Sequence, residues 1–209
     1  PVLQYPGDLM VMQEIIWKIK PTMIIETGVA FGGMTLFYAA MIKALRDKRR
    51  FHAPIKRVIG IDIKISNHTR NAITESKYPT IIKLIERSSV DKKNLNYIKS
   101  RIYNGYGKSE AVFVSLDSDH THDHVLQELK LYAPLVSVGS YIVIFDTAIQ
   151  FYGHLDKNQD RPWGIGNNPW TATQEFLKSD LGKCFVIDKD VEQRALVTSA
   201  IDGFLKRVS

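Results

Sequence analysis

The chain has 209 residues, a formal charge of +6 at pH 7 and 44% hydrophobic residues, which is typical of a globular domain. Its single cysteine, Cys184, excludes an internal disulfide and a cysteine metal cluster. No secretory signal is visible and no apolar run approaches the ~18 residues of a membrane helix, so we expect a cytoplasmic protein without a membrane partner.

The excess of basic residues suits an anionic partner, but its distribution does not indicate one. The lysines and arginines are scattered, and the densest cluster, from Lys43 to Lys56, is interrupted by Asp47. There is no motif that interleaves aromatic and basic residues. We therefore expect a solvated surface and no nucleic-acid partner.

Strands and helices alternate along most of the chain. A helix with apolar residues at helical spacing is expected within residues 1–20, with Asp8 as its cap and Pro21 as its stop. Apolar runs predict strands at Met23–Ile25, Val58–Ile61, Ile81–Ile85, Ala111–Leu116 and Tyr141–Phe145. Helical patterns separate them at Met34–Leu45, Asn67–Ser76, Asp91–Tyr103 and Thr121–Tyr132. This alternation predicts an α/β fold, a parallel sheet with helices on both faces.

The C-terminal part follows another pattern. A loop rich in Gly, Pro and Asn precedes a helical segment, Pro169–Ser179. Phe185–Ile187 and Leu196–Ala200 have the composition of strands, and Asp202-Gly203 predicts a turn. Because no repeat or linker is visible, we expect residues 1–209 to form one domain, onto which the helix within residues 1–20 packs.

Four expected strands end in an acid: Glu26, Asp62, Asp117 and Asp146. In an open α/β sheet, ligands bind beyond the carboxyl ends of the strands. One such acid is as often a helix cap or a turn residue. Four of them at one edge indicate a binding site.

The first strand runs into a glycine-rich turn, Gly28-x-x-x-Gly32-Gly33, that opens a helix. This turn is neither the dinucleotide fingerprint nor a Walker loop, and a plain strand-to-helix turn is the structural alternative. Glycines let a ligand approach the backbone, and the helix start offers free N–H groups. Asp62 ends the next strand and can accept hydrogen bonds from both ribose hydroxyls. The glycine turn and Asp62 together favour an adenosyl ligand, because a neutral or cationic ligand tolerates a nearby carboxylate better than a pyrophosphate does.

The densest polar cluster is the stretch 116–124, with three histidines and three acids. In one interpretation Asp117 and Asp146 bind Mg²⁺, and His120 is the general base that deprotonates a substrate hydroxyl. In a second, the histidines bind a transition metal. In a third, the stretch is a solvated helix start capped by Asp119 or Thr121.

Two further segments have both a functional and a structural interpretation. Ser88 and Ser89 follow the third strand, where they can line an adenine pocket or cap the next helix. The loop 161–170 contains two tryptophans between glycines and prolines. It can form a substrate lid, a subunit contact or ordinary packing.

The segments ETGVAFGG, GIDI, LDSDHTHDHV, IVIFDT and DRPWGIGNNP, in this order, resemble the cephalosporin hydroxylase-like family. The resemblance covers about Asp8 to Arg207, and LDSDHTHDHV and RPWGIGNNP are its specific segments. This family is similar to class I S-adenosylmethionine-dependent methyltransferases. The resemblance implies a Rossmann-like fold with a seven-stranded, mostly parallel sheet whose last strand is antiparallel. It also implies methylation of a hydroxyl on a sugar, a polysaccharide precursor or a secondary metabolite.

The resemblance also implies roles for particular residues. The S-adenosylmethionine site would comprise Glu26, Thr27, Gly28, Gly32, Asp62, Ile63, Ser88, Ser89 and Asp117. Asp117 and Asp146 would bind Mg²⁺, and His120 and Asp117 would be catalytic. The chain departs from metal-dependent relatives at Phe145 and Thr147, which flank Asp146 where a second acidic or amide ligand is usual.

Two other functions compete with O-methyl transfer. One is a hydroxylase with iron on two histidines and a carboxylate, although residues two apart on a helix point to different sides. The other is a non-catalytic binder of a nucleotide or nucleic acid. For the leading function we expect a small-molecule or glycan acceptor. Members of the family often assemble, so a homo-oligomer is a further expectation.

Overall fold

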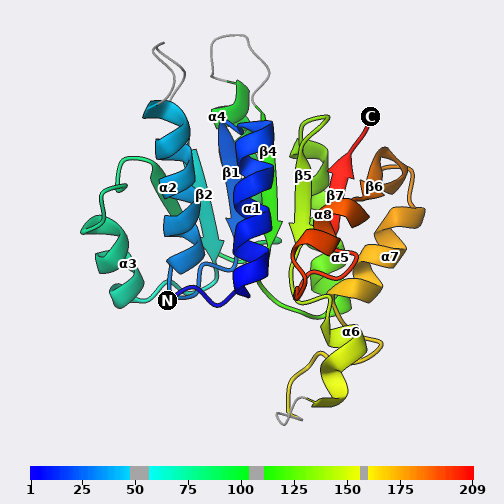
Figure 1. Cartoon of the computed structure of the whole chain (residues 1–209). Coiled ribbons are helices and arrows are strands. Elements are labelled where there is room, and N and C mark those ends of the chain that lie inside the picture. Colours follow the sequence, from blue (N-terminus) through cyan, green and yellow to red (C-terminus); the bar gives the residue numbers. More distant parts are fainter. Residues whose placement is uncertain (48–56, 104–110, 156–159) are drawn as a thin grey trace.

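The computed structural model describes residues 1–47, 57–103, 111–155 and 160–209 (Figure 1). Most of the basic cluster noted between Lys43 and Lys56 lies outside these ranges. Of the helices in the described ranges, none has the length and apolar content to cross a lipid bilayer.

A single sheet of seven strands organises the fold. Its strands are β1 (Met23–Thr27), β2 (Arg57–Asp62), β3 (Ile82–Glu86), β4 (Val112–Leu116), β5 (Tyr141–Ile144), β6 (Phe185–Ile187) and β7 (Phe204–Arg207). They lie in the order β3-β2-β1-β4-β5-β7-β6. The first five pair in parallel, and β7 runs antiparallel to both β5 and β6. The predicted fold, mostly parallel with its last strand reversed, is confirmed.

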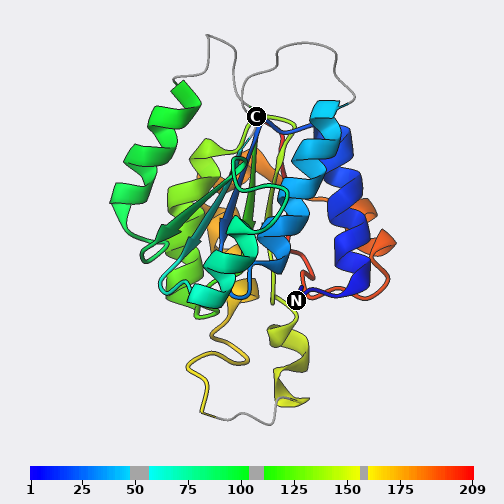
Figure 2. The ribbon, with the colours of Figure 1, turned by 90° about the vertical axis from the view of Figure 1, so that its left-hand side faces the viewer.

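Helices cover both faces of the sheet (Figures 1 and 2). They are α1 (Pro6–Ile19), α2 (Gly33–Asp47), α3 (Asn67–Thr74), α4 (Lys92–Tyr103), α5 (His122–Tyr132), α6 (Ile149–Tyr152), α7 (Pro169–Lys178) and α8 (Lys189–Arg194). One core joins the sheet to α1, α2 and α8, and includes Ile24 and Val143. The other joins it to α4, α5 and α7, and includes Ile25 and Ile142. Since side chains alternate between faces, both cores draw on the same strands, which explains the continuous apolar runs.

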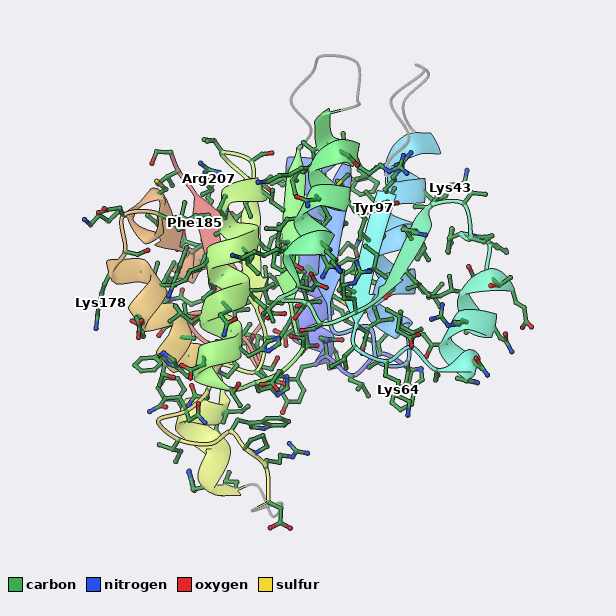
Figure 3. The ribbon with its side chains drawn as sticks, turned by 180° about the vertical axis from the view of Figure 1, so that it is seen from behind. Lys43, Lys64, Tyr97, Lys178, Phe185 and Arg207 are labelled. Carbon is green, nitrogen blue, oxygen red and sulfur yellow. The ribbon has the colours of Figure 1, made fainter. Side chains whose placement is uncertain are left out.

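Figure 3 shows the face of the sheet that α4, α5 and α7 cover. Lys43, Lys64 and Lys178 lie far apart on the outline of the molecule in this view.

The N-terminal helix begins at Pro6, so the prediction that Asp8 caps it is wrong. Tyr5 is the cap residue and makes no side-chain capping bond. Proline is favoured at the first helical position because its missing N–H has no partner there in any case. Asp8 lies within the first turn and is completely buried.

The strand predicted at Leu196–Ala200 is also wrong. This segment is an irregular turn after α8, and the last strand begins only at Phe204. The chain takes a left-handed conformation at Leu196 (φ 60°) and at Asp202 (φ 58°), which breaks any extended run. Leu196 is 92% exposed. Its apolar side chain is therefore in solvent and does not pack against the sheet.

The parallel strands point their carboxyl ends toward the lower edge of the sheet in Figure 1. The acids predicted to form a binding site follow or end these strands: Glu26 in β1, Asp62 in β2, Asp117 after β4 and Asp146 after β5. Because β4 pairs with both β1 and β5, the topology brings Asp117 and Asp146 to neighbouring positions.

Candidate active site

The glycine-rich turn packs directly against the end of β4. Gly28 has a φ of 82°, and a Cβ built on it would lie 1.8 Å from the carbonyl oxygen of Asp117. Its N–H donates to the Ile61 carbonyl at 2.8 Å. Gly32 also has a positive φ, but the nearest atom to its Cβ would be the Thr69 methyl, at 3.1 Å. Both the positive φ and the lack of room for a Cβ therefore require a glycine at position 28.

Asp62 lies beside this turn. Its Oδ2 accepts hydrogen bonds from the backbone N–H groups of Val29 and Ala30, at 2.9 and 3.0 Å, and its Oδ1 accepts from Lys64 N at 3.0 Å. A carboxylate has about four acceptor sites, so further donors such as ribose hydroxyls find room on the same group. Ile63, the next residue, is 76% exposed. Asp62 thus ties the end of β2 to the glycine turn at the predicted place.

Glu26 and Thr27 lie beneath the turn and are both buried. Glu26 accepts a hydrogen bond from the Thr35 hydroxyl. Burial raises the pKa of Glu26 from its ordinary value of 4.5 to about 8, although the bond from Thr35 opposes the rise. The Thr27 hydroxyl has no hydrogen-bond partner among the described residues.

Glu26 should make the stability of the protein depend on pH. A carboxyl group with a raised pKa keeps its proton in the folded state where the unfolded chain has lost it. The free energy of unfolding should therefore fall as the pH rises from about 4.5 toward about 8. Thermal unfolding of the wild type and of Glu26→Gln, at pH 6 and pH 9, checks this. We expect the melting temperature of the wild type to drop more, and an identical drop would contradict the assignment.

Ser89 belongs to a buried polar cluster between the end of β3 and α5. Its Oγ lies 2.8 Å from Nε2 of His124, and its carbonyl accepts from the Tyr132 hydroxyl at 2.5 Å. Glu128, also buried, accepts from the Ser118 hydroxyl at 2.6 Å. The Ser89 hydroxyl is therefore occupied by His124. The cluster fixes the loop for which the sequence predicts an adenine pocket.

This cluster does not have the geometry of a nucleophilic triad. Glu128 approaches the same Nε2 atom of His124, at 3.6 Å, that Ser89 contacts. In a triad the acid orients the opposite ring nitrogen. Ser88 is half-buried, and its carbonyl accepts from the Asn94 amide at 2.9 Å.

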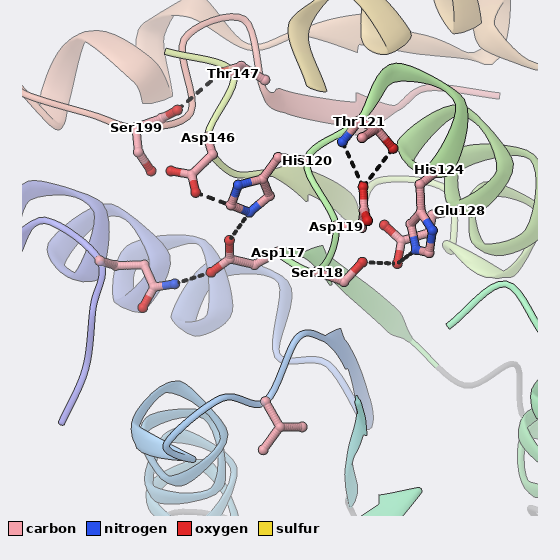
Figure 4. A network of polar contacts seen from close by, with 12 residues as sticks. Asp117, Ser118, Asp119, His120, Thr121, His124, Glu128, Asp146, Thr147 and Ser199 are labelled. Carbon is pink, nitrogen blue, oxygen red and sulfur yellow. Dashed lines mark hydrogen bonds and ion pairs between the residues drawn. The ribbon is translucent and has the colours of Figure 1, made fainter. Parts of the chain in front are cut away.

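Asp117, His120 and Asp146 form a compact centre (Figure 4). Nε2 of His120 lies 3.5 Å from Oδ1 of Asp117 and 3.2 Å from Oδ2 of Asp146. Candidate ligand atoms of the three residues all lie within 4.8 Å of one another. The other oxygen of Asp117 accepts a hydrogen bond from the Gln4 amide at 2.5 Å. The two acids and the base predicted to work together are thus in one place.

The electrostatics of this centre follow from burial and from the close negative charges. Burial raises the pKa of Asp117, and the charge of Asp146 adds to the rise, while the hydrogen bond from His120 opposes it. Burial alone would lower the pKa of His120. The hydrogen bond to Asp117 and the charges of Asp146 and Asp117 outweigh burial and raise the pKa. The close carboxylates therefore favour the protonated form of His120, and a divalent cation bound between them would oppose that effect.

The other two histidines of the stretch point elsewhere. Nδ1 of His122 lies 2.9 Å from the Thr171 hydroxyl, and its Nε2 lies 3.2 Å from Glu175. His124 contacts Ser89. Within the described residues, only one histidine joins the two carboxylates. This arrangement suits a hard cation better than an iron site with two histidines.

The tryptophan loop reaches the same centre. The ring of Trp163 packs against that of His120, with centroids 4.9 Å apart and an interplanar angle of 60°. The Asn168 amide donates to the Gly164 carbonyl at 2.8 Å and to Gln150 Oε1 at 2.7 Å, which holds the loop in shape. The loop therefore presents an indole to the predicted base.

Two cavities meet at Asp146. The first, of about 360 Å³, lies between the glycine turn and the N-terminal segment, and its lining includes Asp117 and His120. The second, of about 600 Å³, lies on the side of α6 and the tryptophan loop. Tyr5, Asp146 and Ser199 line both. Asp117 and His120 line the smaller cavity, and Asp146 is the residue of the centre that lines both.

Some residues of the site were not predicted. Gln4 and Tyr5 lie just before α1, where no site residue was expected, and Ser199 lies in the segment predicted as a strand. Their presence depends on how α1 and the turn after α8 fold onto the sheet edge. No local sequence pattern marks Gln4, Tyr5 or Ser199 as residues of the site.

Comparisons with known proteins agree in family and fold. The sequence model of the family "Rhamnosyl O-methyltransferase/CmcI" matches residues 1–208. The chain is 31% identical over 202 residues to the rhamnosyl O-methyltransferase of Mycobacterium bovis (strain BCG / Pasteur 1173P2), which covers 96% of this chain and 73% of that one. An apo structure of CmcI has a TM-score of 0.67 at 17% identity, covering 100% of this chain and 73% of its own. A CmcI structure described with Mg and SAM has a TM-score of 0.62 at 17% identity, covering 100% and 74%. At this identity the structures show a shared fold.

Proposed function

The chain belongs to the rhamnosyl O-methyltransferase/CmcI family, and we propose on that basis that it transfers a methyl group from S-adenosylmethionine to a hydroxyl of a sugar or natural product. The observation that carries the proposal is the juxtaposition of the glycine-turn cavity with Asp117, His120 and Asp146. A donor in the smaller cavity and a hydroxyl in the larger one would meet at Asp146, beside the predicted base. We further propose that residues 1–209 act as one domain, because both cores are built on one sheet.

The glycine turn and its surroundings fit an adenosyl sulfonium. Gly28 and Gly32 would line its methionine end above Glu26 and Thr27, and Asp62 with Ile63 would hold its ribose. Ser88 and Ser89 would flank the adenine, with Ser89 acting through its backbone because His124 occupies its hydroxyl. The cofactor supplies an electrophilic methyl group on a cationic sulfur. None of the described residues that line the smaller cavity is Lys or Arg, whereas Asp117 and Asp146 are both there.

Asp117 and Asp146 would hold Mg²⁺. Magnesium prefers oxygen ligands and keeps several waters, so two carboxylates suffice for a protein site. The neighbours of Asp146 add no ligand. Phe145 is buried and apolar, and the Thr147 hydroxyl donates to the Ser199 carbonyl at 3.2 Å. We therefore propose a Mg²⁺ site with few protein ligands, which would leave room for an acceptor hydroxyl.

His120 would remove the proton of the acceptor hydroxyl at Nε2, the atom that faces both carboxylates. Its pKa is raised in the free protein, and a cation on Asp117 and Asp146 would lower it and leave the imidazole neutral. Trp163 packs on the ring and restricts its orientation. Catalysis would then combine positioning with one proton transfer.

The larger cavity would receive the acceptor. Aromatic side chains of Tyr5, Tyr152 and Trp163 line it, and Asp146 lies where it meets the smaller cavity. Aromatic faces combined with a carboxylate suit a hydroxylated ring such as a sugar. Because the curated relatives are named for a rhamnosyl group, rhamnosides are the first acceptors to test.

The direct test is methyl transfer from labelled S-adenosylmethionine to a panel of rhamnosides and hydroxylated natural products. We expect the label in the product with Mg²⁺ and its loss with a chelator. Asp146→Asn should raise the Mg²⁺ requirement. A product that gains an oxygen atom instead, in a reaction dependent on iron, would support the hydroxylase and overturn the proposal.

A further inference from the structure

Asp8 is a carboxylate buried on the inner side of α1, outside the centre described above. It is 0% exposed, and burial raises its pKa, although hydrogen bonds from neighbouring Thr198 and Ser199 oppose the rise. Burying a carboxyl group among apolar residues is costly when its hydrogen bonds do not compensate for lost hydration. Such a residue in a helix whose other buried positions are apolar suggests a specific task.

The contacts of Asp8 lead toward Asp146 in two steps. Its Oδ2 accepts hydrogen bonds from the backbone N–H of Ser199 at 3.1 Å and from the Ser199 hydroxyl at 3.3 Å. The carbonyl of the same serine accepts from the Thr147 hydroxyl at 3.2 Å and from the Ala148 N–H at 3.0 Å. Thr147 and Ala148 directly follow Asp146. Figure 4 shows Thr147 donating to Ser199, with Asp146 beside them.

The backbone around this connection is tightly constrained. Asp146 has a φ of 56°, a left-handed conformation that is unfavourable for a residue other than glycine. The Thr147 hydroxyl and the Ala148 N–H both donate to the Ser199 carbonyl, so Ser199 helps to hold Asp146 in this conformation. On the other side, a Cβ on Gly7 would lie 2.0 Å from the Ala195 carbonyl oxygen. The start of α1 thus lies directly against the turn that contains Ser199.

We propose that Asp8 is a positioning residue, which sets the orientation of Asp146 for metal binding through Ser199 and Thr147. This inference rests on the proposed function, because it assumes that Asp146 is a metal ligand. It assigns part of the site to the N-terminal helix, far from the strand ends in sequence. Groups that orient metal ligands typically change metal affinity by about 10–100-fold when they are removed.

The test measures Mn²⁺, as a probe for Mg²⁺, by electron paramagnetic resonance in the presence of S-adenosylhomocysteine. Asp8→Ala and Thr147→Val should each weaken Mn²⁺ binding by about tenfold. Asp8→Asn keeps an oxygen that can accept from Ser199, so its Mn²⁺ affinity should lie clearly closer to that of the wild type than the affinity of Asp8→Ala does. Affinity for S-adenosylhomocysteine without metal should stay unchanged in all variants.

Glu14 provides a matched control on the same helix. It is an exposed acid that also joins α1 to α8, through an ion pair with Arg194 at 2.9 Å. Glu14→Ala removes that ion pair without changing the contacts of Ser199, so the Mn²⁺ affinity of this variant should equal that of the wild type. If Glu14→Ala weakens Mn²⁺ binding as much as Asp8→Ala does, general loosening of α1 explains the effect and the proposal is overturned.

Hydrogen exchange of the Ala148 amide separates this inference from the proposed function. The amide should exchange faster in Asp8→Ala than in the wild type, with or without metal. A wild type that fails to bind Mn²⁺ would count against the proposed metal site, and the exchange rate would still decide the role of Asp8. Unchanged exchange together with unchanged Mn²⁺ affinity in Asp8→Ala overturns the inference.

Discussion

Replacing His120 by alanine should lower the rate of methyl transfer by roughly 10²–10⁴-fold, the usual contribution of a general base. The imidazole is the one described group that lies within 3.5 Å of both carboxylates and can take a proton from a hydroxyl bound there. His120 lines the smaller cavity, but its contacts are with the two carboxylates and Trp163, so the affinity for S-adenosylhomocysteine should fall far less than the rate. Single-turnover rates and calorimetry on the same preparation measure the two quantities.

The control for this variant is His122→Ala. His122 lies two residues along the chain, but its ring contacts Thr171 and Glu175 on α7. Its replacement should reduce thermal stability slightly and leave the chemical step close to that of the wild type. An equal loss of rate in both variants would contradict the role of His120 as the general base. A loss of cofactor affinity in His120→Ala would assign it to the donor site instead.

Gly28→Ala should destabilise the protein more than alanine at any other described glycine with a positive φ. The new Cβ would lie 1.8 Å from the Asp117 carbonyl oxygen, so β1 and β4 must separate at the edge where the site is built. The φ of 82° adds the cost of a left-handed alanine. Together, overpacking and conformation should reduce the free energy of unfolding by about 3–5 kcal/mol. Protein that still folds should bind S-adenosylhomocysteine much more weakly.

Gly139→Ala separates the two causes. Gly139 has nearly the same φ, 83°, but apart from the residue itself and its two chain neighbours no described residue has an atom within 4 Å of the point that a Cβ would occupy. Its substitution should cost only the conformational part, about 1–2 kcal/mol. Urea unfolding of both variants gives the comparison. If the two lose the same free energy, the close contact between the glycine turn and Asp117 has no energetic weight.

The sequence predicted the order and type of most elements because the buried strands are continuous apolar runs between helical patterns. It also predicted that Asp117 and Asp146 would be neighbours, since parallel strands carry their ends to one edge. It failed at Leu196–Ala200, where an apolar composition accompanies a left-handed turn with an exposed leucine. Local composition does not show whether an apolar residue meets a partner.

The site was predictable only as far as it lies at the strand ends. Asp8 looked like a helix cap because acids are common at helix starts, but its side chain points into the protein and binds Ser199. Ser89 looked available to a ligand, whereas its hydroxyl contacts His124 from another helix. Thr147 flanks Asp146 where a second metal ligand is usual, whereas its hydroxyl donates to the Ser199 carbonyl. In each case a contact between distant segments decides the role.

The measurement that tests the central claim most directly is calorimetric titration of the protein with S-adenosylhomocysteine, with and without Mg²⁺. We expect binding at one site per chain in both conditions, and weaker binding by Asp62→Ala because that carboxylate holds the glycine turn. Folded protein that binds no S-adenosylhomocysteine in either condition would contradict the assignment of the glycine turn as the donor site, and with it the proposed methyl transfer.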